Sequence, residues 1–158
     1  MAGDDSLGFA ELERTHLRAG YLPDFEWLRY AEPSPHTPLA MPLSEARVAL
    51  VDTSGAHVTG TPPSGSSGRA LLLPVDAEIT FTHPGFDVER AARDPEVVHP
   101  VRTLQRLAAD GVIGELAPTA VSVMGGVLIG QRLIDRGVPT AVAAMRDLHV
   151  DLALLVPV

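Results

Sequence analysis

The 158-residue chain contains no cysteine and no lysine. The lack of cysteine excludes disulfides, thiolate nucleophiles and Cys-ligated zinc or iron–sulfur sites within this sequence. The lack of lysine excludes a Schiff-base lysine and the ammonium group of a phosphate-binding P-loop. The chemistry open to these residues is therefore that of His, Asp, Glu, Arg and hydroxyl groups.

Basic clusters and long apolar runs are also missing. The net charge is −8, with no basic stripe, which disfavours nucleic acid and anionic membranes as partners. No apolar run approaches the ~20 residues of a membrane-spanning helix, and the acidic start "MAGDDSLGFAELERTH" does not resemble a secretory signal. A hydrophobic fraction of 46% argues against disorder. We expect a soluble, cytoplasmic protein that binds a small molecule or another protein.

The sequence predicts two regions, residues 1–45 and residues 46–158. In the first, leucines spaced among charges predict a short amphipathic helix over residues 6–19. Closely spaced prolines follow, together with both tyrosines and the only tryptophan. Because prolines prevent a long helix and aromatic rings need cover, we expect an irregular Pro-rich arm laid over the domain surface.

The second region alternates between strand and helix patterns. Apolar runs at 48–51 and 78–82 predict strands, and the spacing over 101–108 predicts a helix. One or two helices are expected around Gly137 and Pro139, and the run 151–158 is expected to be a strand buried on both faces. This order predicts an α/β fold with an open, mainly parallel sheet of Rossmann or flavodoxin-like type.

Small polar residues follow the first predicted strand. Asp52, Thr53 and Ser54 could offer oxygens and backbone N–H groups to a ligand at the carboxyl end of the strand. They could equally form a tight turn whose side chains satisfy one another. His57 could point into the same crevice.

The motif "HPGFD" offers a second candidate site. His83 and Asp87 could perform acid–base work or position a substrate amine. Alternatively, Asp87 caps the helix of "VERAAR" while His83 bonds to the backbone. A metal site built from His57, His83 and His99 with Asp87 or Asp94 is a further alternative. The sequence lacks a tight ligand spacing such as HxH or HExxH, so we expect no metal.

Several segments, in their order, resemble a known family. These are "PLSEARVALVDTSGAHV", "HPGFD", "RDPEVVHPVRTLQRLAADGVIGELAP", "VSVMGG" and "VDLALLVPV". From about Trp27 onward the chain resembles the selenoprotein B family of the glycine, sarcosine, betaine and D-proline reductases. The most specific parts of the resemblance are "DPEVVHPVRTLQRLAADGVIG" and "LLVPV".

The resemblance implies a redox function. In that family the strand corresponding to "LLVPV" is followed at once by selenocysteine or cysteine, so the nucleophile would follow Val158 and the α/β domain would be incomplete here. Selenocysteine is encoded by UGA, normally a stop codon. The implied protein is a bacterial, oligomeric oxidoreductase component that reductively cleaves C–N bonds of amino acids or related amines. The isolated chain would be inactive.

The resemblance also implies partners and site residues. A pyruvoyl group on a partner subunit would handle the amine substrate, with no cofactor in this chain. His57, His83 and Asp87 would line the substrate side, with Asp52, Thr53 and Ser54 beneath it. Arg69 is the only nearby candidate for the substrate carboxylate.

Other interpretations stay open. The chain could be a non-redox α/β module whose crevice binds a small molecule or a protein, in which case a ligand should raise its melting temperature. A metal-dependent hydrolase built on the histidines is a third hypothesis. In every case we expect apolar surface at the last strand and self-association into a homo-oligomer, to be checked by light scattering.

Overall fold

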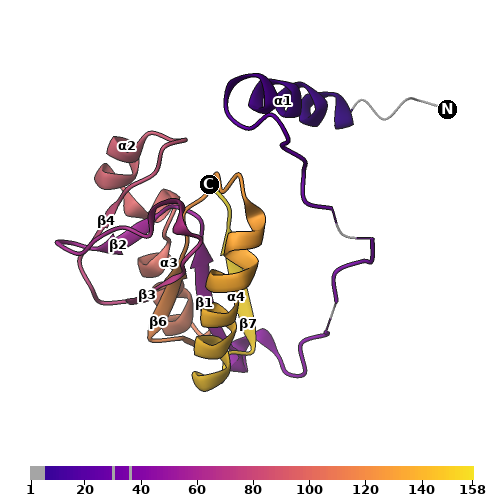
Figure 1. The fold of residues 1–158 in the computed structure, drawn as a ribbon. Coiled ribbons are helices and arrows are strands. Elements are labelled where there is room, and N and C mark those ends of the chain that lie inside the picture. The colour runs from indigo at the N-terminus through magenta and orange to yellow at the C-terminus, as the bar shows by residue number, and fades with distance from the viewer. Residues whose placement is uncertain (1–5, 30, 36) are drawn as a thin grey trace. The chain divides into compact units, whose positions relative to one another are not determined.

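The computed structural model describes residues 6–29, 31–35 and 37–158 of the chain (Figure 1). It consists of two compact units, Met1–His36 (unit 1) and Thr37–Val158 (unit 2). Among the described residues, no helix is long and apolar enough to cross a membrane.

Unit 1 is a helix with a returning segment. Helix α1 (Ser6–Gly20) confirms the helix predicted there. The chain then turns back, and the Trp27 indole Nε1 donates to the Ala10 carbonyl at 3.0 Å. The Phe25 ring packs edge-on against Trp27 with centroids 4.9 Å apart, and Arg18 Nε donates to the Phe25 carbonyl at 2.8 Å. Aromatic residues after α1 are therefore held against the helix that precedes them.

Unit 2 alternates between short strands and helices, as the sequence predicts. In chain order its elements are η1 (Leu43–Glu45), β1 (Arg47–Asp52), β2 (Ala56–Val58), η2 (Gly65–Ser67), β3 (Leu71–Pro74), β4 (Ile79–Phe81), α2 (Val88–Arg93), η3 (Pro95–Val97), α3 (Val101–Ala109), β5 (Glu115–Leu116), β6 (Thr119–Ser122), α4 (Gly130–Asp147) and β7 (Leu152–Val156). The predicted α/β class is confirmed.

Strand β1 lies inside a mostly parallel sheet. It pairs in parallel with β7 on one side and with β5 and β6 on the other, and β3 adds to β6 as an antiparallel edge. The strand expected at 78–82 exists as β4, but it pairs with β2 in a separate antiparallel sheet. The prediction of a mainly parallel sheet is confirmed, with β3 as the exception.

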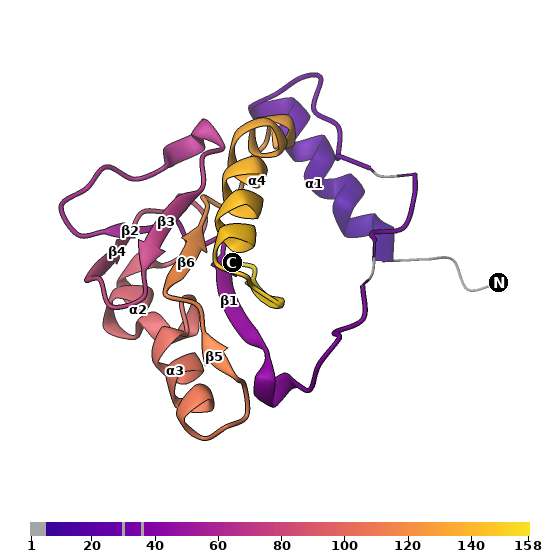
Figure 2. The same cartoon turned by 90° about the horizontal axis from the view of Figure 1, so that it is seen from below.

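The core follows the alternation of side chains along β1. Val48 and Leu50 point to one face, where they pack against Val101 and Leu104 of α3. Figure 2 shows α3 and α4 on opposite sides of the sheet. A second cluster joins β4, α2 and β3 through residues that include Phe81, Ala91 and Leu73.

The prediction that β7 is buried on both faces is wrong. Within the described chain β7 pairs only with β1, so its other edge has no neighbouring strand. Leu155 is 68% exposed, and Leu152 and Leu154 are also exposed. An apolar strand is buried on both faces only when strands or helices flank it on every side. Self-association through this edge stays a prediction.

Helix α4 is a single helix that continues through Pro139. Gly137 brings it close to the chain before β3, because a Cβ at Gly137 would lie 2.7 Å from the Gly68 carbonyl oxygen. Gly137 therefore serves packing, because glycine permits the helix backbone to approach the turn directly.

Candidate functional site

The carboxyl ends of β1, β6 and β7 meet and are hydrogen-bonded to one another. Thr53, after β1, donates its N–H to the Val156 carbonyl at 3.2 Å. Gly125, after β6, donates its N–H to the Thr53 carbonyl at 2.8 Å, and Val158 N–H donates to Thr53 Oγ1 at 2.8 Å. Ligands and chemistry gather at this edge in open α/β sheets. The candidate site is therefore built around Thr53.

A buried polar network lies under this edge, centred on the fully buried Asp52. Its Oδ1 accepts hydrogen bonds from Ser54 N–H at 2.9 Å, from the Ser54 hydroxyl and from the Ser122 hydroxyl at 2.7 Å. Its Oδ2 lies 2.8 Å from Nδ1 of the buried His99. Ser122 Oγ in turn accepts from Ala56 N–H at 2.9 Å. One carboxylate thus joins β1, β6 and the entry to α3.

The sequence-predicted residues Asp52 and Ser54 belong to this network. The tight-turn alternative is borne out, because Asp52 satisfies both the N–H and the hydroxyl of Ser54. Both residues are fully buried beneath the edge. Thr53 is only partly buried. A substrate-binding role for the three stays a prediction.

His83 lies beside the same edge. Gly85 N–H donates to His83 Nδ1 at 2.9 Å, which assigns the proton of the neutral imidazole to Nε2. A Cβ on Gly125 would lie 2.6 Å from His83 Nε2, 2.9 Å from the Thr53 carbonyl oxygen and 3.2 Å from the Val158 carbonyl oxygen. Nε2 is buried and has no hydrogen-bond partner within the described part of the chain. The imidazole therefore packs against the Gly125 backbone, and its Nε2–H donates no hydrogen bond to a described residue.

Asp87 and His57 make hydrogen bonds that support the fold. Asp87 Oδ1 accepts from Glu89 N–H at 3.0 Å and from Arg90 N–H at 3.3 Å, so it is the N-cap of α2. The capping alternative for Asp87 and the backbone bond expected of His83 are thus both observed. His57, on β2, is buried with Nε2 3.1 Å from Thr82 Oγ1. Their binding roles stay predictions.

Two network residues, His99 and Ser122, were missed as site residues. His99 entered only as a metal candidate, and Ser122 was not singled out. Each is a polar residue inside an apolar stretch, "VVHPV" and "AVSVM". A polar side chain buried in such a stretch needs a hydrogen-bond partner, which is the signal that could have found them.

Comparison with known proteins adds to this geometry. No family model and no solved structure matches the chain. Over 124 residues, 75% of its length, it is 27% identical to "D-proline reductase subunit gamma" of Acetoanaerobium sticklandii. Over 108 residues, 61% of its length, it is 32% identical to "Sarcosine reductase complex component B subunit beta" of Peptoclostridium acidaminophilum. The chain is a homologue of these reductase subunits.

This homology confirms the resemblance to the reductase selenoprotein B family. The match covers 51% of the length of the D-proline reductase subunit and 24% of the length of the sarcosine reductase subunit, so the chain spans about half or less of these relatives. Within its described residues, no group of three or more His, Cys, Asp or Glu side chains could hold a metal ion.

This protein should lose stability in mild acid because of His83. Burial lowers the pKa of His83 below its ordinary value of 6.5, and its ring packs against Phe86 with centroids 4.7 Å apart. The unfolded chain therefore binds a proton at a higher pH than the folded chain does. The stability that neutral His83 provides is complete above about pH 6.5 and is lost as the pH falls toward the lower folded-state pKa.

Urea unfolding at a series of pH values between about 7.5 and 5 would measure this loss. We expect a steeper decline for the wild-type chain than for His83→Gln. Equal pH dependence of the two proteins would contradict the assignment to His83.

Proposed function

We propose that the chain is a component of an amino acid reductase complex that cleaves a C–N bond of an amino acid or a related amine. One observation carries the proposal. In this chain, which is homologous to reductase subunits, the carboxyl ends of β1, β6 and β7 are hydrogen-bonded to one another at one edge of the sheet. There Val158 N–H is fixed to Thr53 Oγ1, next to Gly125 and His83. The names of both relatives describe reductase subunits, which supports a role in such a complex.

We further propose that a redox selenocysteine or cysteine follows Val158 directly. The hydrogen bond to Thr53 fixes the main chain at this point, so a following side chain would emerge beside the His83 imidazole. A selenolate or thiolate supplies the nucleophile for attack on carbon. The Nε2–H of His83 would donate to that anion and stabilise it, since this donor is otherwise unused.

The resemblance supplies the proposed roles of the remaining site residues. Asp52 and Ser54 would hold Thr53 from beneath, while His57 and Asp87 would line the substrate side. A pyruvoyl-bearing partner subunit would supply the electrophilic carbonyl that holds the amine. In the overall reaction the C–N bond breaks, carbon and nitrogen each gain one hydrogen, and a dithiol reductant becomes a disulfide. Homo-oligomer formation belongs to the same proposal.

The finer fold assignment is also a proposal. From β1 the chain passes through α3 to β6 on one side, and then through α4 to β7 on the other. Strand order that diverges from a central strand, with helices on both faces, is the arrangement of doubly wound, flavodoxin-like folds. It supports placing the reaction at the carboxyl edge.

Reading the gene beyond the Val158 codon tests the proposal first. An in-frame UGA or Cys codon followed by coding sequence is the expected result. The extended chain, with Cys at that position, should cleave the C–N bond of D-proline, sarcosine, betaine or glycine in the presence of a dithiol and a pyruvoyl-bearing subunit. Cleavage opens the ring of D-proline and releases an amine or ammonia from the other three. A Ser at the same position is the control. An extended Cys protein that is inert to all four substrates would overturn the proposal.

A further inference from the structure

Every polar group of Thr53 is engaged at the carboxyl edge. Its N–H donates to the Val156 carbonyl at 3.2 Å, and its carbonyl accepts from Gly125 N–H at 2.8 Å. Its Oγ1 accepts from Val158 N–H at 2.8 Å and donates to the Val158 carbonyl oxygen at 3.4 Å. The main chain of Thr53 thus links β1 to β7 and β6, while its side chain binds both polar main-chain groups of Val158.

The side-chain bond replaces a main-chain bond that the sequence forbids. The ladder between β1 and β7 begins where Asp151 N–H donates to the Arg47 carbonyl at 3.0 Å. Because the donors of a parallel strand recur every second residue, residue 157 would donate to the Thr53 carbonyl. Residue 157 is proline, which has no N–H. The regular ladder therefore stops before Val158, and the Thr53 hydroxyl supplies the bond that the main chain cannot.

The main chain beneath the Thr53 side chain is held by the buried network. Asp52, the last residue of β1, is hydrogen-bonded to Ser122 and His99. Because side chains alternate along a strand, Thr53 points away from this network, and it is only partly buried. Threonine is β-branched, so its χ1 angle is restricted. The hydroxyl is therefore held at the edge in a defined direction.

The residue that Thr53 holds lies beside His83. A Cβ on Gly125 would lie 2.6 Å from His83 Nε2 and 3.2 Å from the Val158 carbonyl oxygen, so both atoms pack against the same side of Gly125. The main chain of Val158 leads directly to the residue that follows it. Its position therefore decides whether that residue lies beside the imidazole.

We propose that Thr53 is a positioning residue, whose hydroxyl holds Val158 so that the redox residue proposed to follow it faces Nε2 of His83. The inference rests on the proposed function for the identity of that residue. Thr53 acts through the main chain of Val158, which differs from the substrate contact that the family resemblance implies for it. The essential group is the hydroxyl, so serine should replace threonine and valine should not.

Amide hydrogen exchange of the 158-residue chain, followed by NMR, tests the hydrogen bond without catalysis. Thr53→Val keeps the shape of the side chain and removes the hydroxyl, so Val158 N–H should exchange roughly two- to tenfold faster than in the wild type. Gly125 N–H, which donates to the Thr53 carbonyl, should keep its wild-type rate. Thr53→Ser should restore slow exchange, and Thr59→Val, at an exposed threonine, is the control. An unchanged rate at Val158 in Thr53→Val would overturn the inference.

The extended protein, with Cys after Val158, tests the consequence for reactivity. Loss of the Thr53 hydroxyl should move the thiol away from His83, so the pH midpoint of its alkylation by iodoacetamide should rise toward the ordinary thiol pKa of about 8.5. In the C–N cleavage assay, kcat should fall by roughly ten- to a hundredfold while KM stays within about twofold, because a displaced nucleophile slows the reaction and leaves substrate binding intact. Thr53→Ser should recover most of the rate.

Failure of this inference and failure of the proposed function give different results. An inert extended wild-type protein would overturn the reductase proposal and with it the redox role of Thr53. An active wild-type protein, with wild-type kcat and alkylation midpoint in Thr53→Val, would overturn the positioning role alone and leave the reductase proposal intact.

Discussion

Replacing Asp52 by alanine is expected to lower the free energy of unfolding by about 3–5 kcal/mol. The substitution removes the common acceptor of Ser54, Ser122 and His99, all of which stay buried. Each buried donor left without a partner costs roughly 1–3 kcal/mol, and the losses within one network are not additive. Since whole domains are stable by about 5–15 kcal/mol, this change approaches global unfolding.

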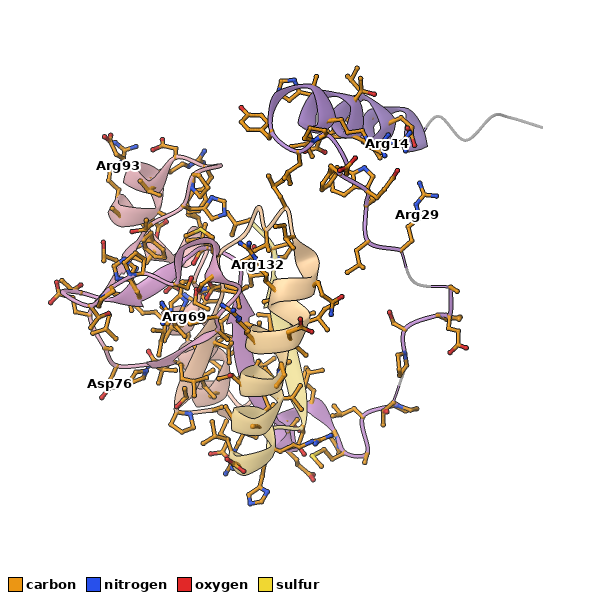
Figure 3. The ribbon with its side chains drawn as sticks, in the orientation of Figure 1. Arg14, Arg29, Arg69, Asp76, Arg93 and Arg132 are labelled. Atoms are coloured by element: carbon orange, nitrogen blue, oxygen red, sulfur yellow. The ribbon has the colours of Figure 1, made fainter. Side chains whose placement is uncertain are left out.

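Urea unfolding followed by circular dichroism would measure the effect. The matched control is Asp76→Ala, an exposed aspartate labelled in Figure 3, which should stay within about 0.5 kcal/mol of wild type. A double-mutant cycle of Asp52→Ala with His99→Ala should give a coupling energy above about 1 kcal/mol, because the two side chains are in contact. A loss below about 1 kcal/mol in Asp52→Ala would show that Asp52 does not organise the edge.

Gly55→Ala is expected to be the second most damaging change, with a loss of more than about 3 kcal/mol. Gly55 has a φ of +67°, and a Cβ there would lie 2.2 Å from the Thr82 carbonyl oxygen. The methyl group would push apart the start of β2 and the end of β4, which pair next to the point where Thr82 N–H donates to the Gly55 carbonyl at 3.2 Å. The main chain must move, because the clash is between a Cβ on Gly55 and the main-chain oxygen of Thr82, and neither atom can swing away like the end of a flexible side chain.

Gly60 provides the control for this prediction. Its φ is +81°, but nothing lies within 4 Å of a Cβ built there. Gly60→Ala should therefore cost only the left-handed strain, about 1 kcal/mol. Thermal unfolding of the two variants separates the cost of the left-handed backbone from the cost of the steric clash at Thr82. Equal losses of stability in Gly55→Ala and Gly60→Ala would refute the steric argument.

The sequence predicted those elements whose pattern is local. The apolar run before Asp52 identified β1, the spacing of Val101 and Leu104 identified α3, and Asp87 before "VERAAR" identified the cap of α2. Strand β3 was missed because "LLLP" has no alternation and ends in proline. The pairing of β4 with β2, instead of with the main sheet, depends on contacts that no short window contains.

The site was predictable only in outline. The strand pattern before "DTSG" predicted where β1 ends, and Asp52 is its last residue. Two partners of Asp52, His99 and Ser122, lie 47 and 70 positions away along the chain, so local patterns do not reveal them. The sequence prediction was wrong at β7, because "LALLV" was expected to be buried on both faces and is partly exposed. Apolar composition says that a strand should be covered, but only the pairing shows whether it is.

The pairing of β1 with β7 determines when the domain can fold during synthesis. Val48 lies opposite Leu152, so the partner of an early strand is translated after nearly all of unit 2. At ~5–20 residues per second, β1 waits on the order of ten seconds for this neighbour. Contacts so distant in sequence also form slowly once the chain is complete. The nascent polypeptide therefore emerges with the buried strand β1 paired on one side only, and chaperones that shield such segments should associate with it during synthesis.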